Sequence, residues 1–420
     1  MPEIASSEVA AAVADAHRRE WAFVLAATVR VAGDLDSAEE AVQDAYASAL
    51  ATWGSRGIPD NVGAWLTTTA RRRALDVLRR NATARGALPK LFEPLGETDT
   101  DAPDVPDDRL RLIFTCCHPA LSREAQVALT LRLVCGLSTD DVARAFLVAE
   151  PTMAARITRA KQKITKAHIM YRIPSATELP ERLDAVLSVV HLVFTSGHSS
   201  PSGANLMRRD LAERGHELAR LLRALLPDSS EVAALLALIL LTDARRDARI
   251  DATGRLVLLA DQDRARWDHG AIGEGVAHLR DVLAKRNPSR FALMAAIAAV
   301  HDEARRWDDT DWHEIVGLYD LLLQTWPSPV VAMNRAIAVG FAVGPSEGLA
   351  ELDSLSTDPL LARYGYFAAA RADFLRRLGR TDDARVAYDE AIILTDNAVE
   401  RDFLVEARDS SRRNRAAASG

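Results

Sequence analysis

The 420-residue sequence is poor in cysteine and in aromatic residues, and both shortages exclude classes of protein. Its three cysteines, two of them adjacent, cannot form the disulfide framework of a small secreted protein and fit a reducing compartment. Aromatic residues make up only 5% of the chain, which together with abundant Ala, Leu and Arg favours helices over sheets. With 48% hydrophobic residues, the chain is not intrinsically disordered.

Long apolar runs and the common catalytic motifs are also missing. The longest apolar runs, such as residues 232–241, are too short to cross a bilayer, and the first 14 residues lack the basic segment of a secretory signal. There is no P-loop, no dinucleotide-binding motif, no zinc-protease motif and no nucleophile elbow. We therefore expect a cytoplasmic protein that is not an enzyme, has no catalytic residue and needs no metal or cofactor.

The residues with potential metal-binding chemistry lack the spacing of a metal site. Cys116 and Cys117 are adjacent and precede His118, without the C-x-x-C spacing that zinc sites use. His191 and His198 stand seven residues apart in an apolar segment. We expect all five side chains to pack in the core.

The formal net charge of −7 hides a strong segregation of charge. Residues 1–174 contain 22 basic and 22 acidic residues, so the whole excess of acid lies in residues 175–420. Residues 71–90 contain seven bases against one acid, residues 91–108 seven acids and no base, and residues 150–172 six bases against one acid. Two basic segments divided by an acidic stretch are typical of two nucleic-acid-binding modules and a linker, although solvated surfaces would show the same charges.

Helical periodicity and the positions of Gly and Pro predict an all-α fold with four parts. We expect a helical block at 10–85, an acidic, proline-containing linker at 86–108, a second helical block at 109–172 and an all-helical extension at 175–415.

The first block contains an amphipathic helix with an acidic surface. Ser37 and Glu40 have the spacing of a capping box, which predicts that the helix starts there. Its apolar stripe ends in Tyr46, Leu50 and Trp53. The acidic surface, suited to solvent or to a basic partner, is formed by Asp36, Glu39, Glu40 and Asp44.

The next helix, about 62–80, carries an aromatic side chain among basic ones. One arc is apolar, and the opposite arc holds Trp65, Thr68, Arg72 and Arg79. An exposed indole can stack on an unpaired base while guanidinium groups bind phosphates, so this face suits single-stranded nucleic acid. The alternative is that Trp65 packs partly against a neighbouring helix.

The second block has the pattern of a helix-turn-helix. Ser138 and Asp141 form a capping box after Gly136, and Pro151 stands where a second helix would begin. That helix has a core stripe of Met153, Ile157, Ala160 and Ile164. Its adjacent basic face, suited to the major groove, contains Thr152, Arg156, Arg159 and Lys163.

These residues resemble regions 2 and 4 of bacterial RNA polymerase sigma factors, most closely the extracytoplasmic-function group. Region 2 is matched by Asp34, Ala38, Glu39, Gln43, Asp44 and Tyr46, and then by Ala64-Trp65-Leu66, Ala70-Arg71, Arg73-Ala74, Asp76 and Arg79-Arg80. Region 4 is matched by residues 121–164, including Asp141-Val142-Ala143, Arg156 and Arg159-Ala160-Lys161. The segment 114–121 and the long tail resemble a subgroup with an extension related to tetratricopeptide repeats.

The resemblance implies a role for each face. The first helix would bind the clamp of core RNA polymerase through Glu39, Glu40, Gln43 and Asp44. The second would recognise and melt the −10 element of promoter DNA through Trp65, Thr68, Arg72, Arg79 and Arg80. The helix after Pro151 would bind the −35 element through Thr152, Ala155, Arg156, Arg159 and Lys163.

The extension shows one clear repeat, in which Ala372, Leu375, Gly379, Ala384, Tyr388 and Ala391 have tetratricopeptide spacing. A weaker copy runs from Ala336 through Gly348 to Leu352. Stacked helical hairpins bind peptides or proteins, so the extension could bind the basic blocks of its own chain or a separate partner. Two alternatives remain, a helix-turn-helix regulator that never acts as a sigma subunit and a protein-binding scaffold. In neither case is a membrane involved.

Overall fold

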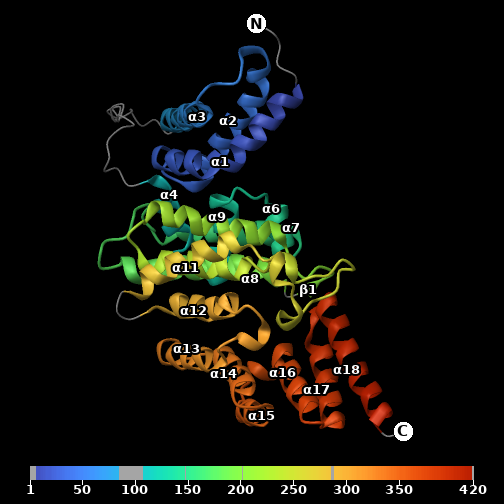
Figure 1. The fold of residues 1–420 in the computed structure, drawn as a ribbon. Helices are drawn as coiled ribbons and strands as arrows, with labels where there is room; N and C mark the ends of the chain where they lie inside the picture. Colours follow the sequence, from blue (N-terminus) through green and yellow to red (C-terminus); the bar gives the residue numbers. More distant parts are fainter. Residues whose placement is uncertain (1–5, 85–106, 147, 201, 285–287, 419–420) are drawn as a thin grey trace. The chain divides into compact units, whose positions relative to one another are not determined.

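The computed structural model describes residues 6–84, 107–146, 148–200, 202–284 and 288–418 (Figure 1). Its regular structure is helical, which confirms the expected all-α fold, apart from the parallel two-residue strands β1 (Ser202–Gly203) and β2 (Asp396–Asn397). The expected linker at 86–108 lies outside the described residues except for its last two. The chain divides into two compact units, Met1–Val190 and His191–Gly420. Within the described ranges no helix is long and apolar enough to span a membrane.

Unit 1 contains two packed groups of helices, α1–α3 and α4–α7, and α1 contacts both. A π-helical turn, η1, continues α5, and α8 begins in unit 1 and ends in unit 2. The helices are α1 (Ser6–Ala32), α2 (Leu35–Arg56), α3 (Val62–Ala84), α4 (Asp108–Cys116), α5 (Arg123–Leu129), η1 (Thr130–Val134), α6 (Thr139–Ala145), α7 (Glu150–Lys166) and α8 (Leu179–His198).

The start of α2 differs from the expected capping box. Gly33, in the left-handed region at φ 81°, ends α1, and Asp34 caps α2 by accepting the backbone N–H of Ser37 at 2.8 Å. The prediction that Ser37 and Glu40 start the helix is therefore wrong, because Asp34 occupies the N-cap position and Ser37 lies inside the first turn of the helix. The apolar stripe of α2 is buried as expected except for Leu50, which is 54% exposed.

The helix-turn-helix of residues 139–166 has the predicted local structure. The Ser138 hydroxyl and the Asp141 carboxylate form the reciprocal capping box at the start of α6. Gly136 has a positive φ of 71°, and Pro151 lies in the first turn of α7. The predicted core stripe of α7, ending in Ile164, is buried throughout, so its opposite face is left to solvent.

Unit 2 is an array in which helices that follow one another along the chain also pack on one another. The long apolar run at 232–241 forms α10, which is buried because α9, α11 and α12 all contact it. The helices are α9 (Arg209–Leu225), α10 (Ser230–Asp243), α11 (His269–Leu283), α12 (Arg290–Glu303), α13 (Trp312–Thr325), α14 (Pro329–Ala342), α15 (Pro345–Ser354), α16 (Gly365–Arg377), α17 (Thr381–Leu394) and α18 (Ala398–Ala418). Short 3-10 turns lie at Arg246–Ala248, Leu259–Asp261, Arg264–Arg266, Trp307–Asp309 and Leu361–Arg363.

The two segments with repeat spacing form helical hairpins in unit 2. In the clearer one, α16 and α17 turn at Gly379, whose φ is 73°, and every small or apolar residue of the pattern before and after it is buried. In the weaker one, α14 and α15 approach closely through Gly340 and Gly348, on which the ring of Phe374 packs. A side chain at either glycine would collide with that ring, so the glycines are required for the close helix packing.

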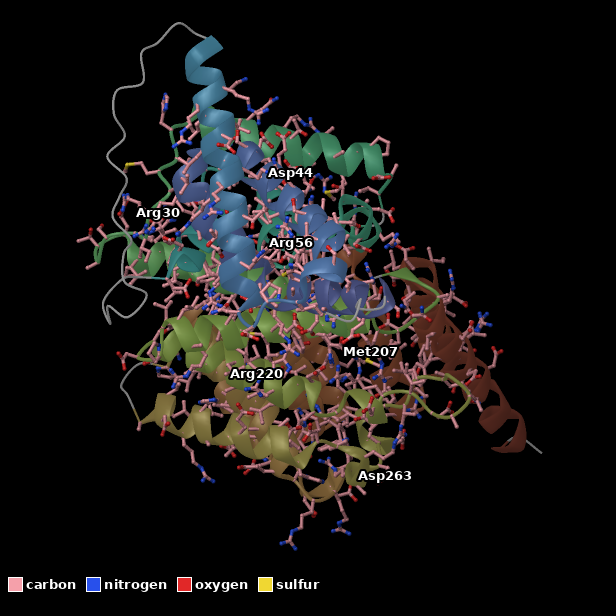
Figure 2. The ribbon with its side chains drawn as sticks, turned by 90° about the horizontal axis from the view of Figure 1, so that it is seen from above. Arg30, Asp44, Arg56, Met207, Arg220 and Asp263 are labelled. Carbon is pink, nitrogen blue, oxygen red and sulfur yellow. The ribbon has the colours of Figure 1, made fainter. Side chains whose placement is uncertain are left out.

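Polar contacts tie distant parts of unit 2 together. The side-chain amide of Asn397, which is fully buried, donates to the backbone carbonyls of Ser200 at 3.1 Å and Asn205 at 2.9 Å. Arg220 of α9, labelled in Figure 2, makes a bidentate ion pair with Glu274 of α11, both N···O distances being 2.8 Å. The bonds of Asn397 join the start of α18 to the segment before α9, and the Arg220–Glu274 pair joins α9 to α11.

Candidate functional surfaces on α2, α3 and α7

The basic face of α3 combines exposed cations with a half-buried tryptophan. Thr68, Arg72, Arg79 and Arg80 are exposed. The Trp65 ring packs edge-on against Trp53 of α2 with 5.4 Å between ring centroids, which confirms the alternative that Trp65 packs partly against a neighbouring helix. Because Trp53 fixes one edge, Trp65 can still offer the remaining part of its ring to a base at little entropic cost.

The basic face of α7 is exposed opposite its buried stripe. Thr152, Ala155, Arg159 and Lys163 are exposed, and together they cover more than three turns of helix. Arg156 is half-buried because its guanidinium lies over the ring of Phe146, 5.4 Å from the ring centroid. This cation–π contact restricts the arginine to the exposed side of the helix-turn-helix. The sequence-predicted residues of this face therefore lie together.

The acidic surface of α2 is divided into an exposed part and a buried part. Glu40, Gln43 and Asp44 are exposed, as expected, and Asp44 is labelled in Figure 2. Glu39 is only 5% exposed, so the expectation that it lies on an open acidic surface is wrong. Leu50, about two turns beyond Gln43 along α2, adds an exposed apolar side chain that the sequence had suggested was buried.

Glu39 is buried by two cations from the second helical group. Its carboxylate pairs with the guanidinium of Arg132 in η1 and with Lys161 Nζ of α7, the latter at 2.7 Å. Lys161 also reaches Asp36 at 2.7 Å. Burial alone would lower the pKa of Lys161, but the carboxylates of Glu39 and Asp36 outweigh burial and raise it. We call Asp36, Glu39, Arg132 and Lys161 the Glu39 cluster.

Further hydrogen bonds join the α1–α3 group to the α4–α7 group and the segment after it. Trp21 of α1 is buried and donates its indole N–H to the carbonyl of Leu133 at 3.0 Å. The Tyr171 hydroxyl lies 2.9 Å from the carbonyl of Ala26 and 3.2 Å from that of Asp108, and burial raises the pKa of this phenol. Sequence patterns did not identify Arg132, Trp21 or Tyr171, because each one contacts residues far away along the chain.

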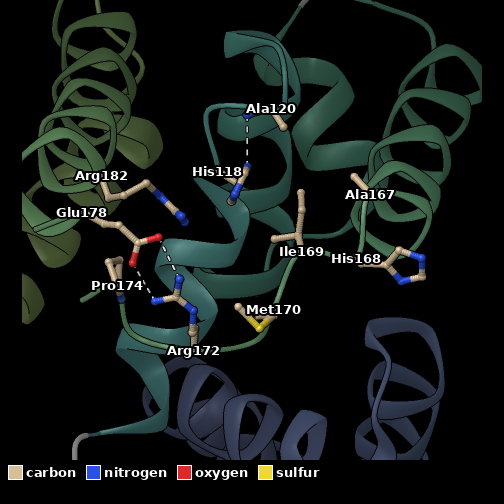
Figure 3. Close-up of a pocket in the computed structure, with 10 residues that line it drawn as sticks. All are labelled: His118, Ala120, Ala167, His168, Ile169, Met170, Arg172, Pro174, Glu178 and Arg182. Carbon is tan, nitrogen blue, oxygen red and sulfur yellow. Dashed lines mark hydrogen bonds and ion pairs between the residues drawn. The ribbon is translucent and has the colours of Figure 1, made fainter.

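Unit 1 also has a cavity of about 230 Å³ beside the end of α7 and the start of α8 (Figure 3). Arg172 and Glu178 line it and form a bidentate ion pair, both N···O distances being 2.8 Å. His118 Nδ1 accepts the N–H of Ala120 at 3.1 Å, and Arg182 donates to a carbonyl of α4. These bonds hold the connection between α7 and α8 in place.

The expected core packing holds for the two adjacent cysteines and in part for His191 and His198, which are half-buried, but it is wrong for His118, which is half-buried and lines the cavity. His198 also lies 3.8 Å from the carboxylate of Asp243. Cys116 and Cys117 are buried, and burial raises the pKa of the Cys117 thiol to about 11. Burial lowers the pKa of His191 and of His198 to about 4, and their rings pack on aromatic neighbours. In the part of the chain that the structure describes, no three His, Cys, Asp or Glu side chains are grouped to hold a metal ion.

Comparisons with known proteins match both helical groups of unit 1 to known families. Residues 17–83 match the family model for sigma-70 region 2, and residues 111–164 match that for sigma-70 region 4. Residues 182–283 match a family of unknown function, DUF6596. An uncharacterized protein of Rhizobium meliloti (strain 1021) is 40% identical over 387 residues, which cover 90% of this chain and 91% of that protein. No solved structure is matched.

The two matched regions, in this order on two helical groups, define a transcription initiation factor that binds core RNA polymerase and promoter DNA. Proteins of this class are typically DNA-binding factors rather than enzymes. The chain belongs to the sigma-70 family, as an extracytoplasmic-function type sigma factor with a C-terminal helical extension. This finding separates it from the two alternatives, a regulator that never acts as a sigma subunit and a scaffold.

Proposed function

We propose that the sigma factor recognises its promoters through the exposed faces of α3 and α7 and binds core polymerase through the exposed face of α2. The observation that carries this proposal is the position of the basic side chains. The basic side chains of α3 and those of α7 each lie opposite the buried stripe of their own helix. Neighbouring helices hold α3 and α7 in place. Region 2 then occupies residues 10–85, region 4 residues 109–172 and the extension residues 175–415, and the protein acts in the cytoplasm, where polymerase and DNA are.

The −10 element is recognised by α3. Trp65, anchored by Trp53, stacks on an unpaired base, and Thr68, Arg72, Arg79 and Arg80 bind the strand around it. Stacking of one base is worth about 1–3 kcal/mol, so a single fixed indole contributes materially to holding the melted strand.

The −35 element is recognised by α7 in the major groove. Residues near the start of a recognition helix contact base edges, which gives this role to Thr152, Ala155 and Arg156. Arg159 and Lys163, one and two turns further on, contact phosphates. Because Arg156 is held over the Phe146 ring, it reaches the groove in one orientation.

The clamp of core polymerase binds α2. Glu40, Gln43 and Asp44 offer an acidic and polar surface, and the exposed Leu50 supplies apolar contact next to it. Glu39 belongs to the same surface once it is released from its partners. The extension controls these activities by binding the basic regions of its own chain or another protein.

Run-off transcription tests the proposal. Purified core polymerase is combined with the full chain or with a chain ending at Val190, on a template carrying the protein's own upstream region. Transcription by either form supports the proposal, and the difference between them gives the direction of control by the extension. If neither form transcribes and neither binds core polymerase, the proposal is wrong.

A further inference from the structure

The cavity beside the end of α7 is lined by residues from separate parts of unit 1 (Figure 3). They include His118 in the turn after α4, Ala167 at the end of α7, and Glu178 and Arg182 where α8 begins. The cavity volume of about 230 Å³ is below the roughly 300–1,000 Å³ of pockets that hold drug-sized molecules. The cavity therefore suits an ion or a small metabolite rather than a peptide.

Two hydrogen-bond donors in this cavity have no partner among the described residues. His118 Nδ1 accepts the N–H of Ala120 at 3.1 Å, and burial and the nearby Arg182 lower the pKa of the ring, which keeps it neutral. A neutral imidazole that accepts through Nδ1 carries its proton on Nε2, so Nε2 is a donor. The second donor is the buried Nε of Arg182, which is unpaired although another nitrogen of the guanidinium donates to the carbonyl of Phe114.

Glu178 also lines the cavity, but its carboxylate oxygens are already occupied. Arg172 binds both oxygens, and Ser175 donates its N–H and its hydroxyl to Oε2 at 2.9 and 2.8 Å. These hydrogen bonds lower the pKa of Glu178 to about 2, so the carboxylate stays ionised. An acceptor for His118 and Arg182 must therefore be supplied by a bound ligand or by water.

The charges around the cavity favour an anion over water. Arg182 forms no ion pair with any described carboxylate, whereas Arg172 is paired with Glu178. Ala167 also lines a neighbouring open hollow of about 440 Å³, together with Arg159, Gln162, Lys163 and Lys166. A phosphate group with two charges gains about twice as much from such cations as a carboxylate with one, and guanidinium groups bind phosphate oxygens with good geometry.

We propose that the cavity binds the phosphate group of a small molecule, of which inorganic phosphate is the simplest, through Arg182 and the Nε2–H of His118. Such a ligand contacts two matched parts of the chain. His118 lies within the match to region 4, and Arg182 is the first residue of the match to DUF6596. A bound phosphate therefore ties the region that contains the helix-turn-helix to the helix that leads into the extension.

Four variants of the full chain test the site in two matched pairs. Arg182→Gln removes the unpaired charge from the cavity. Its control is Arg123→Gln, which removes an arginine of α5 that donates to the carbonyl of Ala185 and does not line the cavity. Ala167→Glu places a carboxylate at the cavity, and Ala167→Gln adds a side chain of the same size without the charge. Because Ala167 is exposed, neither substitution there disturbs the core.

Equilibrium dialysis with labelled inorganic phosphate, in the absence of DNA, measures binding. We expect the wild type and both controls to bind one phosphate per chain with a Kd of about 1 mM or less, since a ligand of few atoms reaches only limited affinity. Arg182→Gln and Ala167→Glu should bind at least about tenfold more weakly, because a charge-assisted hydrogen bond is lost or opposed. No saturable binding by the wild type, or equal binding by all five proteins, would overturn the inference.

A DNA titration distinguishes the phosphate of a small molecule from one of the DNA backbone, which the nearby basic face of α7 would also attract. We expect an excess of duplex from the protein's own upstream region to leave phosphate affinity unchanged. Arg182→Gln should bind this duplex as tightly as the wild type in fluorescence anisotropy. If the duplex displaces phosphate and Arg182→Gln binds the duplex more weakly, the cavity holds a DNA phosphate and the inference is wrong. Neither assay uses core polymerase, so both results are independent of the proposed function.

Discussion

Asp302 of α12 is a buried carboxylate of unit 2 whose charge state should affect stability. Its side chain is fully buried, and neither carboxylate oxygen has a hydrogen-bond partner. The Nε atom of Arg245 lies 3.5 Å from Oδ1 of Asp302, farther than in a close ion pair, and the guanidinium of Arg264 lies nearby. Burial raises the pKa of Asp302 to about 7, although both arginines lower it in part. We therefore predict that Asp302→Asn stabilises unit 2 at alkaline pH.

The sign and size of the expected change in stability with pH follow from proton linkage. Because the pKa is higher in the folded than in the unfolded chain, ionisation of Asp302 costs stability as the pH rises from about 4 to about 7. A tenfold difference in proton affinity is worth about 1.4 kcal/mol, so the full cost at pH 8 is about 4 kcal/mol. About 2 kcal/mol of it is already present at pH 5. The asparagine variant avoids this cost, so its advantage should grow by about 2–3 kcal/mol between pH 5 and pH 8.

Urea unfolding at the two pH values measures the effect. Tryptophan fluorescence is a suitable signal, because Trp307 and Trp312 pack around His301, the neighbour of Asp302. Wild type and Asp302→Asn should have similar free energies of unfolding at pH 4. A variant that is less stable than the wild type at pH 8 would refute the reasoning, since it would show that the ionised carboxylate and Arg245 form a stabilising pair.

Three other substitutions test single side chains. Trp65→Ala should lower permanganate reactivity of the −10 thymines by about 5- to 100-fold while duplex binding stays unchanged, because one stacked base is worth about 1–3 kcal/mol. Normal reactivity would remove the indole from promoter melting. Arg159→Ala should weaken binding to a −35 duplex about 5-fold or more in fluorescence anisotropy, and unchanged affinity would exclude this face of α7. Asn397→Ala should cost unit 2 about 1–3 kcal/mol in urea unfolding, since the buried carbonyl of Ser200 and the carbonyl of the exposed Asn205 lose their donor. A loss below about 0.5 kcal/mol would show that these bonds contribute little.

Local features of the fold could be predicted because each depends on residues close together in the chain. The capping box at Ser138, the proline in the first turn of α7 and its buried stripe all follow from contacts within four residues. The turn at Gly379 follows from the same kind of pattern. The start of α2 shows the limit, since two acceptors, Asp34 and Ser37, could each cap the helix and the sequence alone favoured the wrong one.

The candidate site could be predicted only in part, for the same reason. The basic residues of α3 and α7 lie together as expected, because a helix places residues three and four apart on one face. The sequence left open whether Trp65 is exposed or packs on a neighbouring helix, and it wrongly placed Leu50 in the buried stripe. Both depend on how closely α2 and α3 pack and on which edge of α2 is left uncovered.

The sequence by itself determined that this chain is helical, where its basic faces lie and which family its two regions resemble, since composition and helical periodicity carry that information. Only the tertiary structure decided which acidic residue of α2 is withdrawn from solvent. Glu39 and Glu40 are adjacent and chemically alike, yet one is buried and the other exposed. The difference comes from Lys161, 122 residues from Glu39, and from Arg132. Ion pairs over such separations form only after both regions have folded and packed, so no local pattern in the sequence contains them.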